Sequence, residues 1–237
     1  MYVNKSTYNV DIVLCIDCTE SMDNILNIVK AKALGFYDDI IGTMKEKGKE
    51  ISQLRVRVVA FRDYLAYDEE KRKNAHCNEP MLISDFFVLP NDAHKFEVSV
   101  KSLVPAGGGD DPEDGLEALA YAIRSPWVTA GSKDRHVIVL WTDQVPHNLG
   151  FGKNSEKYPK GMARDLDELT EWWGDVKMPG YMPEQSAKRL ILFAPNEGAW
   201  STISCSWNNL IHYPSKAGDH LKDVDYKTIL NCIAQTI

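Results

Sequence analysis

The sequence has no long hydrophobic run. No stretch of its 237 residues approaches the roughly 18 consecutive apolar residues that a membrane-spanning helix needs. Residues 1–5 also lack the apolar core of a secretory signal peptide. These two absences predict a cytoplasmic protein that does not act on a membrane.

Cysteine is scarce and irregularly spaced. Five cysteines are an odd number at scattered positions, which is not the pattern of a disulfide framework: Cys15, Cys18, Cys77, Cys205 and Cys232. A reducing compartment is therefore expected. Cys15 and Cys18 form a nominal Cys-x-x-Cys, but a redox role is not expected, because Cys15 lies inside an apolar run and Asp17 between the pair disfavours a thiolate.

Basic residues are outnumbered by acidic ones. The net charge is -7 and the isoelectric point is near 5.4, whereas nucleic-acid and anionic-membrane surfaces rely on clustered lysine and arginine. The basic clusters at 45–49 and 71–73 are mixed with glutamate and indicate solvated faces. The charge balance argues against a nucleic-acid partner.

What the chain does contain is enough apolar sequence for a core. Hydrophobic residues make up 44% of it and charged residues 26%, so we expect a folded chain, with one domain over residues 8–237. Apolar, β-branched runs alternate with segments of helical spacing, which predicts an α/β fold with a mostly parallel central sheet and helices on both faces.

The periodicity predicts individual elements. Strands are expected at 10–16, 54–61, 81–89, 136–141, 190–194, 202–206 and 211–213. Helices are expected from Ser21 to about residue 47, from a cap at Asn91 or Asp92 to residue 103, from Pro112 as the first helical residue, and at 226–237.

The segment at about 148–186 is too long for a bare connection between two elements. Leu166, Leu169, Trp173 and Val176 have helical spacing, so a helical insertion with irregular flanks is expected. The adjacent Trp172 and Trp173 are expected in the core.

Polar residues follow the apolar runs where three loops are expected to begin. Asp17, Thr19 and Ser21 follow the first strand, Asp143 follows the strand at 136–141, and Asp110 ends a glycine run. Loops at the carboxyl ends of parallel strands converge, and carboxylate and hydroxyl oxygens are the ligands that hard divalent cations prefer. The sequence therefore predicts a metal site assembled from Asp17, Thr19, Ser21, Asp110 and Asp143.

These loops resemble the metal-ion-dependent adhesion site of the von Willebrand factor A (vWA) domain. In that family the site combines an Asp-x-Ser/Thr-x-Ser loop after the first strand, a Thr-bearing or acidic loop before a later helix, and an Asp after the fourth strand. Asp17, Thr19 and Ser21 match the first loop, and Asp143 matches the third. The resemblance spans residues 10 to about 213, and the Gly-rich second loop followed by Asp and Pro-Glu is similar to bacterial stand-alone vWA proteins.

The resemblance implies a three-layer, Rossmann-like fold and a non-enzymatic module that binds a protein partner through Mg²⁺ (or Mn²⁺ or Ca²⁺). In this view the hydroxyls of Thr19 and Ser21 bind the ion, and the Asp17 and Asp143 carboxylates act through water or through contacts with the ligands. An acidic side chain of the partner completes the shell. Domains of this kind are often associated with protein kinases and phosphatases, so an adaptor in bacterial signalling or stress response is one expectation.

The second loop departs from the family pattern, because the usual Thr is absent. Asp110 at the ion would tighten its binding and weaken its attraction for a partner's carboxylate. Asp111 directly precedes Pro112 and is better explained as a helix N-cap, although the sequence leaves open which of the two acids reaches the ion.

Simpler interpretations exist for each residue. Thr19 and Ser21 could be helix caps, and Asp143 could be a turn former. His147 is expected to be an exposed polar residue, since no His or Cys stands at metal-binding spacing beside it. A Mg²⁺-dependent phosphoryl-transfer enzyme resembling the haloacid dehalogenase family is the alternative function. That family requires Asp-x-Asp, and Thr19 stands at the position of the second acid.

Overall fold

The computed structural model describes residues 7–65, 79–107, 112–129, 131, 133–178, 180–221 and 224–237. Their strands form a seven-stranded sheet in the order β3-β2-β1-β5-β6-β7, in which β4 also pairs with β2. Five strands run parallel: β1 (Thr7–Asp17), β2 (Glu50–Phe61), β5 (Asp134–Trp141), β6 (Lys188–Pro195) and β7 (Leu210–Ser215). Their carboxyl ends therefore share one edge of the sheet.

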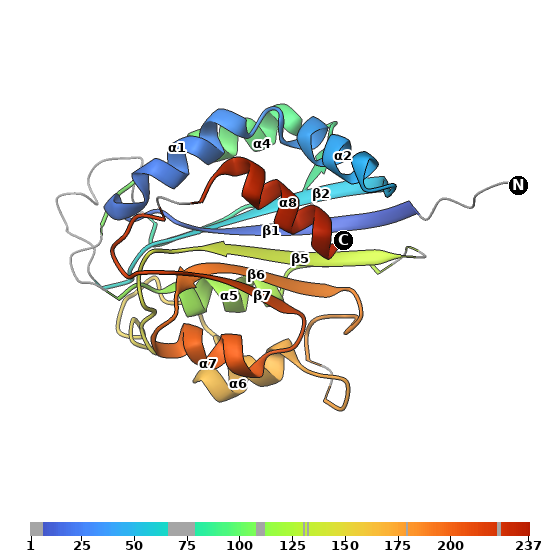
Figure 1. The fold of residues 1–237 in the computed structure, drawn as a ribbon. Coiled ribbons are helices and arrows are strands. Elements are labelled where there is room, and N and C mark those ends of the chain that lie inside the picture. Colours follow the sequence, from blue (N-terminus) through green and yellow to red (C-terminus); the bar gives the residue numbers. More distant parts are fainter. Residues whose placement is uncertain are drawn as a thin grey trace, which may run out of the picture.

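Helices cover both faces of this sheet, as Figure 1 shows. One layer contains α1 (Asp23–Lys32), α2 (Phe36–Glu46), α4 (Ala93–Lys101) and α8 (Tyr226–Thr236). The other contains α5 (Gly115–Ile123), α6 (Leu166–Trp173) and α7 (Gly198–Ser206). Alternate residues of β1 belong to the two cores, with Ile12 and Leu14 on one side and Val13 and Cys15 on the other. The continuous apolar run in the sequence is explained by burial on both faces, which confirms the predicted α/β class.

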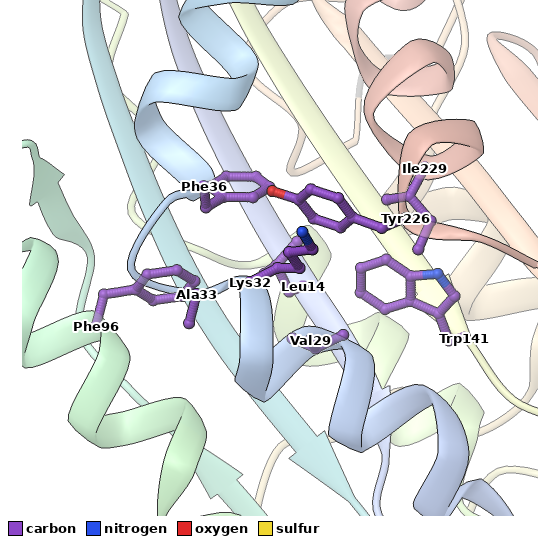
Figure 2. Close-up of a pocket in the computed structure, with 9 residues that line it drawn as sticks. All are labelled: Leu14, Val29, Lys32, Ala33, Phe36, Phe96, Trp141, Tyr226 and Ile229. Atoms are coloured by element: carbon purple, nitrogen blue, oxygen red, sulfur yellow. The ribbon is translucent and has the colours of Figure 1, made fainter.

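The layer that contains α8 is closely packed. A cavity of about 20 Å³ lies among Leu14, Phe36, Trp141 and Tyr226, the last of which comes from α8 (Figure 2). Organic ligands need pockets of about 300 Å³ or more, so this cavity cannot serve as a ligand site.

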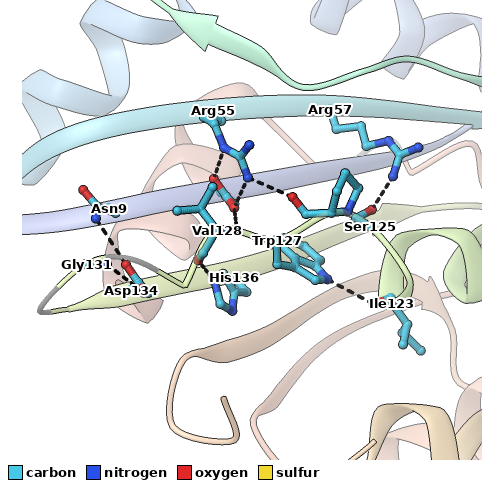
Figure 3. A network of polar contacts seen from close by, with 12 residues as sticks. Asn9, Arg55, Arg57, Ile123, Ser125, Trp127, Val128, Gly131, Asp134 and His136 are labelled. Carbon is cyan, nitrogen blue, oxygen red and sulfur yellow. Dashed lines mark hydrogen bonds and ion pairs between the residues drawn. The ribbon is translucent and has the colours of Figure 1, made fainter. Parts of the chain in front are cut away.

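The amino-terminal half of β1 is held by a polar network (Figure 3). Arg55 donates from Nε and Nη2 to the two carboxylate oxygens of Asp11, at 2.7 and 2.6 Å, and also to the carbonyl of Pro126. The backbone N–H of Val128 donates to the same Asp11 carboxylate, and His136 donates to the carbonyl of Val128. This network attaches the segment after α5 to β1, β2 and β5. The candidate site lies at the opposite, carboxyl ends of β1 and β5.

Three predicted elements are corrected by the structure. The strand expected at 81–89 is two short strands, β3 (Met81–Ile83) and β4 (Phe87–Leu89), both antiparallel to β2. They are separated where the Ser84 hydroxyl accepts the N–H of Val58 in place of a backbone carbonyl. The strand expected at 202–206 is wrong, because these residues belong to α7, which buries Trp200 and Ile203 at helical spacing. The helix expected from Pro112 begins only at Gly115.

Two other helices differ in extent from their predictions. The helix expected from Ser21 is a short 3-10 turn, η1 (Glu20–Met22), followed by α1 and α2, with a break before Gly35, the N-cap of α2. The helix of the 148–186 segment, α6, ends at Gly174, whose positive φ of 71° favours glycine. Trp172 and Trp173 are buried, as expected. The assignment of residues 8–237 to one domain with this insertion stays a prediction.

Lys188 joins β6 to the end of α6. Its ammonium group is buried and donates to the carbonyls of Trp173 and Gly174, at 2.8 and 2.6 Å. It also lies 4.3 Å from the centroid of the Trp173 ring. A cation at a helix carboxyl end is favourable, but burial lowers the pKa of Lys188 to about 8.

We expect Lys188 to make the stability of the fold depend on pH. Between pH 8 and 10 the unfolded chain keeps the Lys188 proton that the folded protein releases, so the free energy of unfolding rises with pH, by at most about 1.4 kcal/mol per pH unit. Lys188→Met should lack this rise. Urea unfolding of both proteins across this range checks it, and parallel pH profiles would contradict the assignment.

Candidate functional site

Asp17 is the last residue of β1 and is completely buried. Its Oδ1 accepts the backbone N–H of Thr19 at 2.9 Å and the Thr19 hydroxyl at 2.6 Å. Its Oδ2 accepts the hydroxyl of Thr142, at 2.8 Å, from the end of the neighbouring strand β5. The carboxylate therefore joins the loops that follow β1 and β5.

Ser21 and Asp143 continue this arrangement. The Ser21 hydroxyl donates to Asp143 Oδ1 at 2.8 Å and lies 3.2 Å from the hydroxyl oxygen of Thr19. A continuous series of oxygens thus runs from Asp17 through Thr19 and Ser21 to Asp143. Four of the five residues predicted for the metal site are brought together. The fifth, Asp110, lies outside the described residues.

The hydroxyls of this series do not cap helices. Thr19 occupies the N-cap position of η1 but makes no side-chain capping hydrogen bond, and the N-cap residue of α1 is Met22. The helix-cap interpretation of Thr19 and Ser21 is therefore wrong. Both hydroxyls are directed to carboxylates instead.

The second loop is attached to the other two on either side of residues 108–111. Before this segment, the backbone N–H of Ala106 donates to the carbonyl of Cys18, and the backbone N–H of Glu20 donates to the carbonyl of Gly107. After it, the backbone N–H of Glu113 donates to the carbonyl of Val145. The contribution of Asp110 to the metal site stays a prediction, because Asp110 lies within this segment. The N-cap residue of α5 is Asp114, and Asp111, which was expected to cap this helix, lies outside the described residues.

Two buried acids share the site. Asp17 and Asp143 are both inaccessible to solvent, and burial, with a smaller contribution from the Asp143 charge, raises the pKa of Asp17 to about 6. Among the described residues, no lysine or arginine forms an ion pair with either acid, and the positively charged partner of Asp143 is His220 when protonated, at 3.5 Å. A divalent cation would offset this excess of negative charge.

The spacing of the oxygens fits a small cation. Octahedral Mg²⁺ binds oxygens at about 2.1 Å, which places neighbouring ligands about 3.0 Å apart. The separations of 3.2 Å between the two hydroxyls and 2.8 Å between Ser21 and Asp143 are close to this value. A hydroxyl that donates its hydrogen to a carboxylate keeps lone pairs for a cation. Thr19 and Ser21 can therefore serve as ligands without losing their present hydrogen bonds.

A loop far along the chain closes over these residues. His220 donates its backbone N–H to Asp143 Oδ2 at 3.2 Å and its Nδ1–H to the carbonyl of Ser21 at 2.7 Å. Gly218 donates to the carbonyl of Asp143 at 2.7 Å. His220 has a φ of 55°, the left-handed region that non-glycine residues seldom adopt. Its sequence neighbours carry no motif that would have identified it.

A second group of potential ligands lies at the same edge of the sheet. One ligand atom from each of Asp63, Asp114 and His147 lies within 4.8 Å of the others, so the group could hold a metal ion. The expectation that His147 is exposed is wrong, since its exposed fraction is 7%. His147 was not identified as a ligand because its neighbours in space come from distant positions in the sequence.

Burial disfavours a thiolate at Cys15. Cys15 and Cys18 are both buried, and burial raises the pKa of the Cys15 thiol. This agrees with the rejection of a redox role for the Cys-x-x-Cys sequence.

The sheet order and its mostly parallel pairing are consistent with a vWA-like fold. Two crystal structures of the pilus adhesin SpaC from Lactobacillus rhamnosus GG are similar to this chain, with TM-scores of 0.53 and 0.51, the second in an open conformation. Their sequences are 13% and 16% identical to this one, so the likeness concerns the fold alone. Each match covers 96% of this chain and 30% of the adhesin chain.

No protein-family model and no curated protein sequence matches the chain. Among the described residues, none of the helices has the length and apolar character required to cross a bilayer.

Proposed function

We propose that this chain is a vWA-type binding module in which Asp17, Thr19, Ser21 and Asp143 hold a divalent cation, Mg²⁺ in the first instance. The observation that carries the proposal is the continuous series of oxygens from Asp17 to Asp143, at separations of 2.6 to 3.2 Å. Asp110 belongs to the proposed site on the sequence resemblance alone.

In the proposed site the two hydroxyls would bind the ion and the two carboxylates would position the hydroxyls. Neutral hydroxyl ligands leave the charge of a bound ion largely uncompensated, and an ion held in this way attracts an anionic group from outside. Asp17 and Asp143 fix the hydroxyls in place through hydrogen bonds. An acidic side chain of a protein partner is the group proposed to complete the shell, and kinase or phosphatase signalling proteins are the partners that the family resemblance suggests.

The pilus adhesins with a similar fold support a binding role over catalysis, although they share the fold alone with this chain. The arrangement of the site and the similarity in fold together support a general role in binding a protein or another ligand. The cytoplasmic location stays a prediction from the sequence.

Phosphoryl transfer is the alternative, and the surroundings of Asp17 argue against it. A nucleophilic carboxylate needs an oxygen that can reach the substrate, whereas both oxygens of Asp17 accept hydrogen bonds and the residue is completely buried. Thr19 cannot act as the second acid of an Asp-x-Asp pair.

An aryl phosphate assay therefore separates the two functions. We expect no Mg²⁺-dependent hydrolysis above the buffer rate. Turnover that disappears in Asp17→Asn would identify the chain as an enzyme and overturn the proposed function.

Divalent cations should stabilise the fold through Asp17. A ligand that binds only the folded state stabilises it by about 2.7 kcal/mol at 100 times its dissociation constant. We therefore expect Mg²⁺ to raise the midpoint of thermal unfolding of the wild type but not of Asp17→Ala. Asp167→Ala, on the exposed surface of α6, is the matched control and should keep the full effect. Equal shifts in wild type and Asp17→Ala would count against the site.

A further inference from the structure

We propose that Asp63, Asp114 and His147 form a second metal site, which binds a transition-metal ion of the zinc class. The site is distinct from the oxygen-only site at Asp17 and does not depend on the proposed function. Its ligand set, and hence its preferred ion, differs from that of the first site.

The three residues come from segments that are distant in sequence. Asp63 lies two residues after β2, Asp114 is the N-cap residue of α5, and His147 follows β5. Their exposed fractions are 1%, 0% and 7%, and His147 Nε2 lies 3.1 Å from Asp63 Oδ2. A tetrahedral ion with bonds of about 2.1 Å places its ligands about 3.4 Å apart. Ligand atoms within 4.8 Å of one another need only small side-chain shifts to reach one ion.

Backbone groups orient both carboxylates toward this position. Asp63 Oδ1 accepts the N–H of Leu65 at 2.6 Å, and Asp114 Oδ2 accepts the N–H of Tyr64 at 2.6 Å. Asp114 is the N-cap residue of α5, yet its side chain makes no capping hydrogen bond with this helix. The ring of His147 is fixed by stacking on Phe151, with ring centroids 3.8 Å apart. Such outer contacts are typical of the groups that hold metal ligands in position.

Glu117 provides a second, independent indication of a ligand. It lies one helical turn after Asp114, so the two side chains share a face of α5, and it is completely buried. Its Oε1 accepts the hydroxyl of Tyr158 and the N–H of Gly150, whereas its buried Oε2 has no hydrogen-bond partner among the described residues. Asp63 is close enough for its charge to contribute, after burial, to the raised pKa of Glu117. A buried carboxylate oxygen without a partner is costly unless the group is protonated or a cation lies nearby.

A cation would also lower the electrostatic cost of burying this group. Asp63, Asp114 and Glu117 are three buried acids, and His147 lies 3.1 Å from Asp63. The buried Arg62 next to Asp63 donates to the carbonyls of Glu79 and Val104 instead. Buried charges in proteins are paired or coordinate metals.

The ligand chemistry selects the ion. Imidazole nitrogen favours Zn²⁺ and related transition metals, whereas hydroxyl and carboxylate oxygens alone suit Mg²⁺. His147 therefore distinguishes this site from the Asp17 site, where the predicted ligands are oxygens.

Calorimetric titration of the whole chain with Zn²⁺, in the presence of saturating Mg²⁺, tests the proposal. A Cys205→Ser background removes the one exposed thiol among the described residues. We expect one tight Zn²⁺ site per chain, and an affinity loss on the order of 100-fold in His147→Gln, since even loss of a supporting contact costs 10- to 100-fold. His94→Gln is the matched control, because the His94 side chain is exposed and should not contribute.

The outcomes separate this site from the first one. Asp17→Ala should keep the Zn²⁺ site, so failure of the proposed function leaves this result unchanged. If His147→Gln does not fold by circular dichroism, Asp63→Asn replaces it, and Co²⁺ absorption of the wild type reports whether the bound ion is tetrahedral. Equal Zn²⁺ affinity in wild type and His147→Gln, loss of binding in His94→Gln, or no binding by the folded wild type would overturn the proposal. The last result would mean that His147 and Asp63 form a structural ion pair only.

Discussion

The buried carboxylate of Asp17 is the interaction on which the proposed site depends. The register of β1 against β5 pairs Ile16 with Trp141, which places Asp17 next to Thr142 at the ends of two adjacent parallel strands. Removing a carboxylate from water is costly, and three hydrogen bonds from Thr19 and Thr142 offset part of this cost. The same hydrogen bonds fix the loops that carry Ser21 and Asp143. The electrostatic cost that remains is a physical reason for a cation at this edge of the sheet.

The carboxyl edge of the sheet contains two groups of acids with different partners. Around Asp17 and Asp143 the neighbouring groups are hydroxyl oxygens, and beside Asp63 the neighbouring group is an imidazole. The loop between α4 and α5 is attached to the first strand loop before residues 108–111 and to the third loop after them. It therefore connects the surroundings of both groups.

Most strands, and the proximity of the four polar side chains after β1 and β5, are predictable because the relevant signals are local. Continuous apolar runs identify strands buried on both faces, and polar residues directly after them lie at the shared carboxyl edge. Asp17, Thr19, Ser21 and Asp143 were found in this way. Thr202 and Ile203 were misassigned to a strand because β-branched residues favour strands, while the burial of Trp200 and Ile203 on one helical face decided the outcome.

The remaining features depend on long-range contacts that no local pattern encodes. His220 meets Ser21 across 199 positions, and His147 meets Asp63 across 84. The sequence neighbours of His147 offer no metal-binding spacing, whereas the fold brings it to Asp63, after β2, and to Asp114, at the start of α5.

The central claim is that the hydroxyls and carboxylates after β1 and β5 bind one divalent cation. A calorimetric Mg²⁺ titration of the metal-free chain and of Ser21→Ala tests it most directly, with Ser102→Ala, an exposed serine, as the control. The account predicts one Mg²⁺ per chain, with binding strongly weakened by Ser21→Ala and unchanged by Ser102→Ala. Equal binding in all three proteins, or no binding by the wild type, would contradict it.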